Sequence, residues 1–334
     1  MLPAIFGSVE CDTDISGLQS RNSVTNFSCA PQREFPVNAR IPLDELVYIR
    51  VQGADTESFL QGQLSNDTRL VNENRAQLSS YSNPKGRMLA VLALFRHGND
   101  TLLELHRSVA EPTLKRLRMF VLRSKVTLQD CTAELPATGL VGESAAGWLE
   151  SLGLPLPQEP MQSASRDGVV VIRRLGAEPR WSVHGPVAGL ESLPAAGFEA
   201  WRRADLRAGV PTVYAETREM FVPQMANLDA LGGISFNKGC YTGQEIVARL
   251  HYLGQLKRRM FLLRAAVAAK PGEPVYDAAG DGQAVGEVVD AVADGDATLL
   301  TAVLQISHAG SEQLALAAID GPRLGPAQAL IATT

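Results

Sequence analysis

The sequence predicts an α+β protein in which two similar halves are followed by a small C-terminal β-barrel. Within residues 43–135 and 139–230, short apolar runs typical of strands are mixed with one or two helical patterns. After Leu256 the helical spacing stops, and short alternating strands are separated by turns at 279–282, 294–296 and 308–310. We therefore expect a mobile arm at 1–40, α+β domains at 41–137 and 138–255, and the barrel at 256–334.

The composition is that of a globular protein, since 45% of the 334 residues are hydrophobic and 20% are charged. A net charge of -5 argues against a generally basic nucleic-acid surface. No apolar run approaches the length that crosses a bilayer, and the first residues lack the basic region of a signal peptide. We expect a cytoplasmic protein. Its four cysteines form no C-x-x-C pair, which favours reduced thiols and predicts no self-contained metal site.

In the first half we expect order to begin at Leu43, with a strand at 47–51 and a short helix capped by Asp55. Residues 77–81 and 88–95 read as paired strands, because the segment 83–86 (Asn-Pro-Lys-Gly) has hairpin-turn chemistry. The strand at 101–106 precedes a helix expected to open at Glu111-Pro112.

That helix and the residues after it form a basic cluster. Such a cluster usually forms the solvent-exposed face of a helix, and contact with RNA is the minority interpretation. The cluster consists of Lys115, Arg116, Arg118, Arg123 and Lys125.

In the second half, strands are expected at 139–142, 169–172 and 181–184, and a helix at 199–209 that ends at Gly209. This helix carries Trp201 among polar residues. A tryptophan here either anchors the helix to the core or offers a flat face to an aromatic ligand.

The segment 237–245 (Asn-Lys-Gly-Cys-Tyr-Thr-Gly-Gln-Glu) holds the richest chemistry of the chain. Thr242 and Glu245 have capping-box spacing and predict a helix that starts there. Cys240 would lie just outside the helix N-terminus, and Lys238 would point to the same side of an extended entry. A cation and a helix N-terminus both favour thiolate over thiol. Cys240 is thus a reactive or ligand-binding thiol, or else a buried structural cysteine, with the two about evenly balanced.

Residues 234–245 also resemble the K-G-C-Y-x-G-Q-E signature of the YgfZ family, and residues 223–229 are similar to the family as well. Members of this family are folate-binding proteins related in fold to the T-protein, the aminomethyltransferase of the glycine cleavage system. The resemblance runs from about Leu43 to the C-terminus. It implies ferredoxin-like, T-protein-like halves and a barrel that closes a three-domain ring.

The resemblance further implies that tetrahydrofolate or a derivative is bound. This sequence differs from the family pattern at two positions of the folate pocket. A second tryptophan of the family pocket falls near Leu46, and the pterin-binding glutamate of the related aminomethyltransferases corresponds to Arg207. A guanidinium cannot accept from the pterin, so Arg207 would serve the glutamate tail of folate instead. The cofactor contacts expected on this basis are Trp201, Leu46, Arg207, Tyr241, Gln244 and Arg249.

A third departure concerns the reaction. The catalytic aspartate of T-proteins corresponds to Ala90 or Val91, so we do not expect aminomethyl transfer. We expect an accessory protein for assembly or repair of iron–sulfur enzymes, including those that thiomethylate tRNA, with an indirect effect on the tRNA. Cys240 would act as the reactive thiol or transient ligand, supported by Lys238 and Glu245. The alternatives are a folate-dependent one-carbon transferase and, third, an RNA-binding module.

Overall fold

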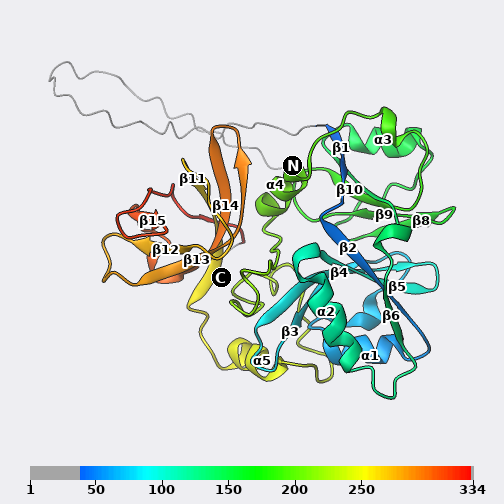
Figure 1. The fold of residues 1–334 in the computed structure, drawn as a ribbon, viewed down its shortest axis with the longest axis horizontal. Coiled ribbons are helices and arrows are strands. Elements are labelled where there is room, and N and C mark those ends of the chain that lie inside the picture. Colours follow the sequence, from blue (N-terminus) through cyan, green and yellow to red (C-terminus); the bar gives the residue numbers. More distant parts are fainter. Residues whose placement is uncertain (1–37, 332–334) are drawn as a thin grey trace, which may run out of the picture. The chain divides into compact units, whose positions relative to one another are not determined.

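The computed structural model describes residues 38–331, which form three antiparallel sheets and five α-helices (Figure 1). The α+β class is therefore confirmed. Closure of the last sheet into a barrel, the ring arrangement and the domain bounds stay predictions. No helix within 38–331 combines the length and the apolar composition that crossing a membrane requires.

The first sheet has the strand order β3-β4-β5-β2-β6. The predicted hairpin at 83–86 is confirmed, because β3 and β4 pair antiparallel on either side of it. β4 lies between β3 and β5, and its long apolar run is almost entirely buried. The strands are β2 (Leu46–Gln52), β3 (Gln77–Ser82), β4 (Met88–His97), β5 (Asp100–His106) and β6 (Thr127–Asp130).

Two helices accompany this sheet, α1 (Thr56–Gln63) and α2 (Arg107–Met119). Asp55 is the N-cap residue of α1, but its carboxylate accepts from the backbone amide of Lys125 rather than from the helix. The predicted opening of α2 at Glu111-Pro112 is wrong, since the helix begins at Arg107 and Pro112 lies inside it. His106 caps α2 by accepting from the amide of Ser108, a role that the sequence pattern did not indicate.

The second sheet has the order β1-β7-β10-β9-β8, and its edge strand β1 pairs with β7, a strand that lies beyond the whole first sheet in the chain. The expectation that order begins at Leu43 is wrong, because β1 starts at Ala39. Residues 1–37 of the predicted arm lie outside the described residues. The strands are β1 (Ala39–Pro42), β7 (Ala137–Val141), β8 (Ser163–Arg166), β9 (Val169–Arg173) and β10 (Arg180–His184), and the helices are α3 (Ala145–Ser151) and α4 (Phe198–Ala208).

Helix α4 ends as predicted, with Gly209 in the left-handed conformation that closes a helix. A helix α5 (Gln244–Tyr252) then precedes the third sheet, whose order is β15-β12-β13-β14-β11-β16. The register of β13 against β14 shifts between Val288 and Asp290. The strands are β11 (Arg258–Ala265), β12 (Pro274–Asp277), β13 (Ala284–Asp294), β14 (Ala297–Gln305), β15 (Leu314–Leu316) and β16 (Gln328–Ala329).

Candidate functional site

The signature segment 237–245 is fixed at its beginning by Lys238. The side chain is buried, and its Nζ donates to the carbonyl oxygens of Leu64 at 2.7 Å and Asn66 at 2.8 Å. The ammonium also lies 5.0 Å from the ring centroid of Tyr241. Burial lowers the pKa of Lys238 to about 8, although the nearby Asp67 opposes the shift.

The residues just before the signature are joined to the same turn after α1. Ser65 Oγ donates to the carbonyl oxygen of Gly233 at 2.7 Å, and the side-chain amide of Asn66 donates to that of Gly232 at 2.7 Å. The amide of Ser235 donates in turn to the carbonyl oxygen of Ser65 at 3.0 Å. These hydrogen bonds join residues 65 and 66 to the backbone of residues 232–235, so the chain that enters the signature is held rigidly.

The end of the signature is fixed by close packing against the β3–β4 turn. Gly243 has a φ of +85°, and a Cβ placed on it would lie 2.5 Å from the carbonyl oxygen of Asn83. Only glycine tolerates both conditions. Further along α5, the side-chain amide of Gln224 donates to the carbonyl oxygen of Val247 at 2.6 Å.

The predicted capping box is wrong. Gly243 is the N-cap residue of α5, and no side chain caps the helix. The side-chain oxygen of Gln244 instead accepts from the amide of Tyr241 at 3.3 Å. Glu245 and Arg249 are exposed on α5, so Glu245 does not hold the loop as we had expected.

Cys240 lies between these two anchors with an exposed side chain, so the alternative of a buried structural cysteine is wrong. Lys238 does not share this exposure, because its ammonium is turned inward to the two carbonyl oxygens. The segment 236–238 is a bend rather than the extended entry we had assumed, which explains why the two side chains part. Cys131, by contrast, is buried and donates to the carbonyl oxygen of Tyr48.

Two of the predicted folate contacts lie elsewhere, at a cavity of about 50 Å³. Leu46 and Trp201 both line it, together with Val91, one of the two positions to which the resemblance assigns the catalytic aspartate of T-proteins. Leu78 lines it as well, and its carbonyl oxygen accepts from Asn66, the residue that also holds Lys238. The cavity and the signature are thus attached to the same strand, β3.

Trp201 is almost fully buried, and guanidinium groups cover its ring. The carbon centres of Arg180 and Arg174 lie 4.9 Å and 5.6 Å from the ring centroid. A Cβ on Gly139 would collide with the ring at 2.6 Å. Trp201 therefore lines the cavity and anchors α4 to the second sheet, which is the first of the two roles that the sequence left open. Stacking on an aromatic ligand stays a prediction.

A buried ion pair borders the cavity. Arg174 donates to Glu104 Oε1 at 2.7 Å, and both side chains are less than a tenth exposed. Ser182 lies 3.4 Å from Arg174 and 3.0 Å from His184 Nε2, so β5 and β10 are connected through polar groups. Glu104 Oε2 has no hydrogen-bond partner within the described residues. His184 Nε2 lies 3.9 Å from this oxygen, beyond hydrogen-bond distance, so the oxygen is an unfilled acceptor.

Two histidines near this pair are kept neutral. Burial, and next the cation of Arg174, lowers the pKa of His184 well below its usual value. Burial, and next the charge of Arg202, lowers the pKa of His106 to about 4. His106 lines the cavity, and its Nδ1 accepts from the backbone amide of Ser108 at the start of α2.

Arg207 does not line the cavity. Its guanidinium lies 3.1 Å from Asp294, a carboxylate that Arg264 also contacts at 2.7 Å. Arg207 thus connects α4 to the third sheet, and a contact with the glutamate tail of folate would require it to leave this ion pair. Tyr241, Gln244 and Arg249 also lie outside the residues that line the cavity.

Glu104 and Arg174 are not among the site residues predicted from the sequence. A signal was present, because Glu104 interrupts the apolar run of β5 and a buried charge needs a partner. Within residues 38–331, no three His, Cys, Asp or Glu side chains lie where they could hold one metal ion.

Known proteins resemble this chain in sequence and in fold. The tRNA-modifying protein YgfZ of Escherichia coli (strain SE11) is 33% identical over 258 residues, which cover 73% of this chain and 79% of that protein. This chain belongs to the YgfZ family. Its relative of the same name from Shigella boydii serotype 4 (strain Sb227) matches with equal identity and coverage. No family model matches the sequence.

Among solved structures, the glycine cleavage system aminomethyltransferase T from Bartonella henselae superposes on this YgfZ family member with a TM-score of 0.71. The match covers 87% of this chain and 85% of that one at 18% sequence identity. The predicted relation in fold to the T-protein is therefore confirmed.

Proposed function

We propose that this chain supports tRNA modification, as the name of its relatives states for them, by assisting iron–sulfur enzymes through the thiol of Cys240. The observation that carries the proposal is an exposed thiol between two rigid anchors, Lys238 and Gly243. A nucleophile or transient ligand works best when the backbone around it is fixed and the sulfur is open to a partner. Cys240 meets both requirements, whereas Cys131 is buried.

The same proposal includes tetrahydrofolate or a derivative as the ligand of the cavity beside Trp201. The chemistry of the lining supports this choice. Glu104 Oε2 is an unfilled acceptor in the lining and can accept from the N–H groups of a pterin, which the guanidinium of Arg207 cannot do. Asp205 also lines the cavity but is paired with Arg180. Leu46 and Val91 supply apolar surface for the flat ring.

The cavity is smaller than this ligand requires. About 50 Å³ holds one or two water molecules, whereas small-molecule sites occupy roughly 300–1,000 Å³. Binding therefore requires one wall to move. Residues 210–212 line the cavity without regular secondary structure, so we assign the movement to this segment.

Calorimetric titration of tetrahydrofolate tests the ligand. We expect the wild-type protein to bind tetrahydrofolate and Glu104→Gln to bind it at least tenfold more weakly. This variant keeps the size of the side chain but not its charge. Arg207→Ala is the matched control, since Arg207 lies outside the cavity, and it should bind as the natural chain does. Equal binding by Glu104→Gln would move the ligand to another site.

Rescue of cells that lack the protein tests the thiol. Cys240→Ser should leave the fold intact and fail to restore the thiomethylated nucleosides of tRNA. Cys131→Ser should restore them, because a hydroxyl can still donate to Tyr48. Full restoration by Cys240→Ser would exclude a thiol mechanism.

A second candidate function is one-carbon transfer from folate, and the unfilled oxygen of Glu104 is the observation that favours it. A carboxylate in the same cavity as Val91 would take the place of the missing aspartate as proton acceptor. Incubation with labelled methylene-tetrahydrofolate and candidate acceptors separates the two functions. Turnover that Glu104→Gln abolishes and Cys240→Ser leaves intact would favour the transferase.

A further inference from the structure

The end of helix α2 and the loop after it carry an excess of positive charge. Residues 107–125 hold six Lys or Arg side chains and one acid, Glu111, although the whole chain has a net charge of -5. Lys115, Arg123 and Lys125 are exposed, and none of them forms a salt bridge with any residue in the range 38–331. Their charges are therefore available to an external anion.

Exposed apolar side chains lie within this basic surface. Met119 is 66% exposed, Phe120 37% and Leu122 86%. The backbone of Leu122 has a φ of +44°, a conformation that costs free energy for a leucine. A polar residue or glycine would serve an ordinary solvated loop better, so the basic cluster is more than the usual helix face.

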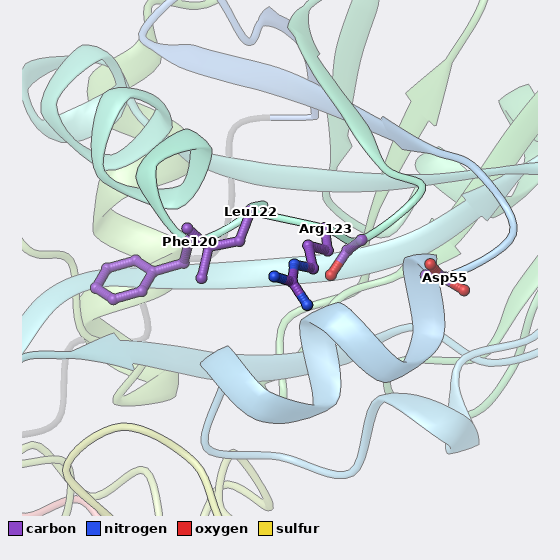
Figure 2. A pocket seen from close by; sticks show the side chains of 5 residues that line it. Asp55, Phe120, Leu122 and Arg123 are labelled. Atoms are coloured by element: carbon purple, nitrogen blue, oxygen red, sulfur yellow. The ribbon is translucent and has the colours of Figure 1, made fainter.

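The loop also borders a hollow of about 710 Å³. Figure 2 shows Phe120, Leu122 and Arg123 on the loop after α2, with Asp55 at the start of α1. Asp55 is the acidic residue of the lining, and its carboxylate accepts from the backbone amide of Lys125 at 2.7 Å. This bond fixes the loop against α1 and uses part of the acceptor capacity of Asp55.

We propose that this surface binds an unpaired loop of a structured RNA. Basic side chains that follow a phosphate backbone, combined with an aromatic ring on which bases stack, are what single-stranded nucleic acid requires. The shallow hollow beside Phe120 leaves room for a base turned out of the stack, and a membrane surface offers no aromatic base for the ring to stack on. The proposal is independent of the folate cavity and of Cys240, neither of which it involves.

Fluorescence anisotropy tests the proposal with three probes. These are a labelled RNA stem-loop with an unpaired loop, a fully paired RNA duplex of equal length, and vesicles containing phosphatidylserine. The variant Lys115→Glu/Arg123→Glu/Lys125→Glu removes the charge, and Phe120→Ala removes the ring. The control Arg166→Glu/Lys270→Glu reverses two exposed basic residues outside the proposed surface.

We expect the stem-loop to bind more tightly than the duplex and with an affinity that falls as salt rises. The triple variant should bind at least tenfold more weakly and show a smaller salt dependence, by about one unit of slope for each phosphate that the protein no longer neutralises. Phe120→Ala should weaken stem-loop binding about tenfold without affecting the duplex. Thermal unfolding of each variant checks that these exposed substitutions leave the fold intact.

Three results would overturn the proposal. The first is equal loss of binding in the control variant, which would indicate nonspecific attraction. The second is equal binding of stem-loop and duplex, which would remove the role of the ring and the hollow. The third is binding to vesicles but not to RNA, which would make the surface a membrane contact.

Discussion

The Nζ of Lys238 donates to the carbonyl oxygen of Leu64, a residue 174 positions earlier in the chain, at 2.7 Å. A lysine beside a cysteine invites the interpretation that its charge serves the sulfur. The buried ammonium of Lys238 instead holds the loop that carries Cys240 to the turn after α1. Its contribution to the site is rigidity.

Replacing this lysine should reduce stability. Lys238→Met leaves two buried carbonyl oxygens without a donor, and we expect a loss of about 2–4 kcal/mol in the free energy of unfolding. Urea denaturation measures it. Lys238→Arg keeps the charge and the donors, so it should lose less. A loss within about 0.5 kcal/mol for Lys238→Met would show that the two bonds contribute nothing.

The stability of the natural chain should also depend on pH through Lys238. Its pKa is about 8 in the folded protein, against 10.5 for the unperturbed group. Between these values the unfolded chain binds more protons, so the free energy of unfolding should rise as pH increases from 8 to 10.5. Lys238→Met should lack this rise. Curves with the same slope for both proteins would contradict the assignment.

Two glycines of the signature offer a matched pair. Gly243→Ala places a Cβ 2.5 Å from the carbonyl oxygen of Asn83 at a φ of +85°, and should cost about 2 kcal/mol or more. Gly239→Ala meets nothing within 4 Å and should cost at most about 0.5 kcal/mol. Thermal unfolding compares them. If the two variants prove equally stable, the packing of α5 on the β3–β4 turn does not fix the signature.

The local elements were predictable from the sequence because their causes are local. The hairpin at 83–86 follows from turn chemistry between two apolar runs, and the end of α4 follows from a glycine that can adopt a left-handed conformation. The YgfZ signature could also be recognised from the sequence, because its residues are contiguous.

What the sequence could not reveal are partners that are distant along the chain. Arg207 is paired with Asp294, which lies 87 residues later, and Glu104 is paired with Arg174 across 70 residues. The capping box failed for a different reason. Thr242 and Glu245 have the correct spacing, but contact with the β3–β4 turn makes Gly243 the N-cap residue, so tertiary packing overrides the local pattern.

The two cysteines of the described range should differ in reactivity. Cys240 is exposed, whereas Cys131 is buried, and burial raises the pKa of the Cys131 thiol. A thiol reagent applied to the native protein should therefore modify Cys240 and spare Cys131, as mass spectrometry of peptides can show. In urea both should react. Rapid modification of native Cys131 would mean that the packing around Tyr48 opens easily.

The ion pair beside the cavity should be far more sensitive to the loss of one partner than to the loss of both. Arg174→Met leaves the carboxylate of Glu104 buried without its cation, and we expect a loss of about 3–5 kcal/mol in the free energy of unfolding. Replacing both partners, as Arg174→Met/Glu104→Leu, removes the unpaired charge and should recover most of that loss, because apolar residues often substitute for a buried pair without cost. Denaturation of the two single variants and the double variant gives the coupling energy directly. Additive losses would mean that water already reaches Glu104, and the cavity would then be open to solvent in the ligand-free protein.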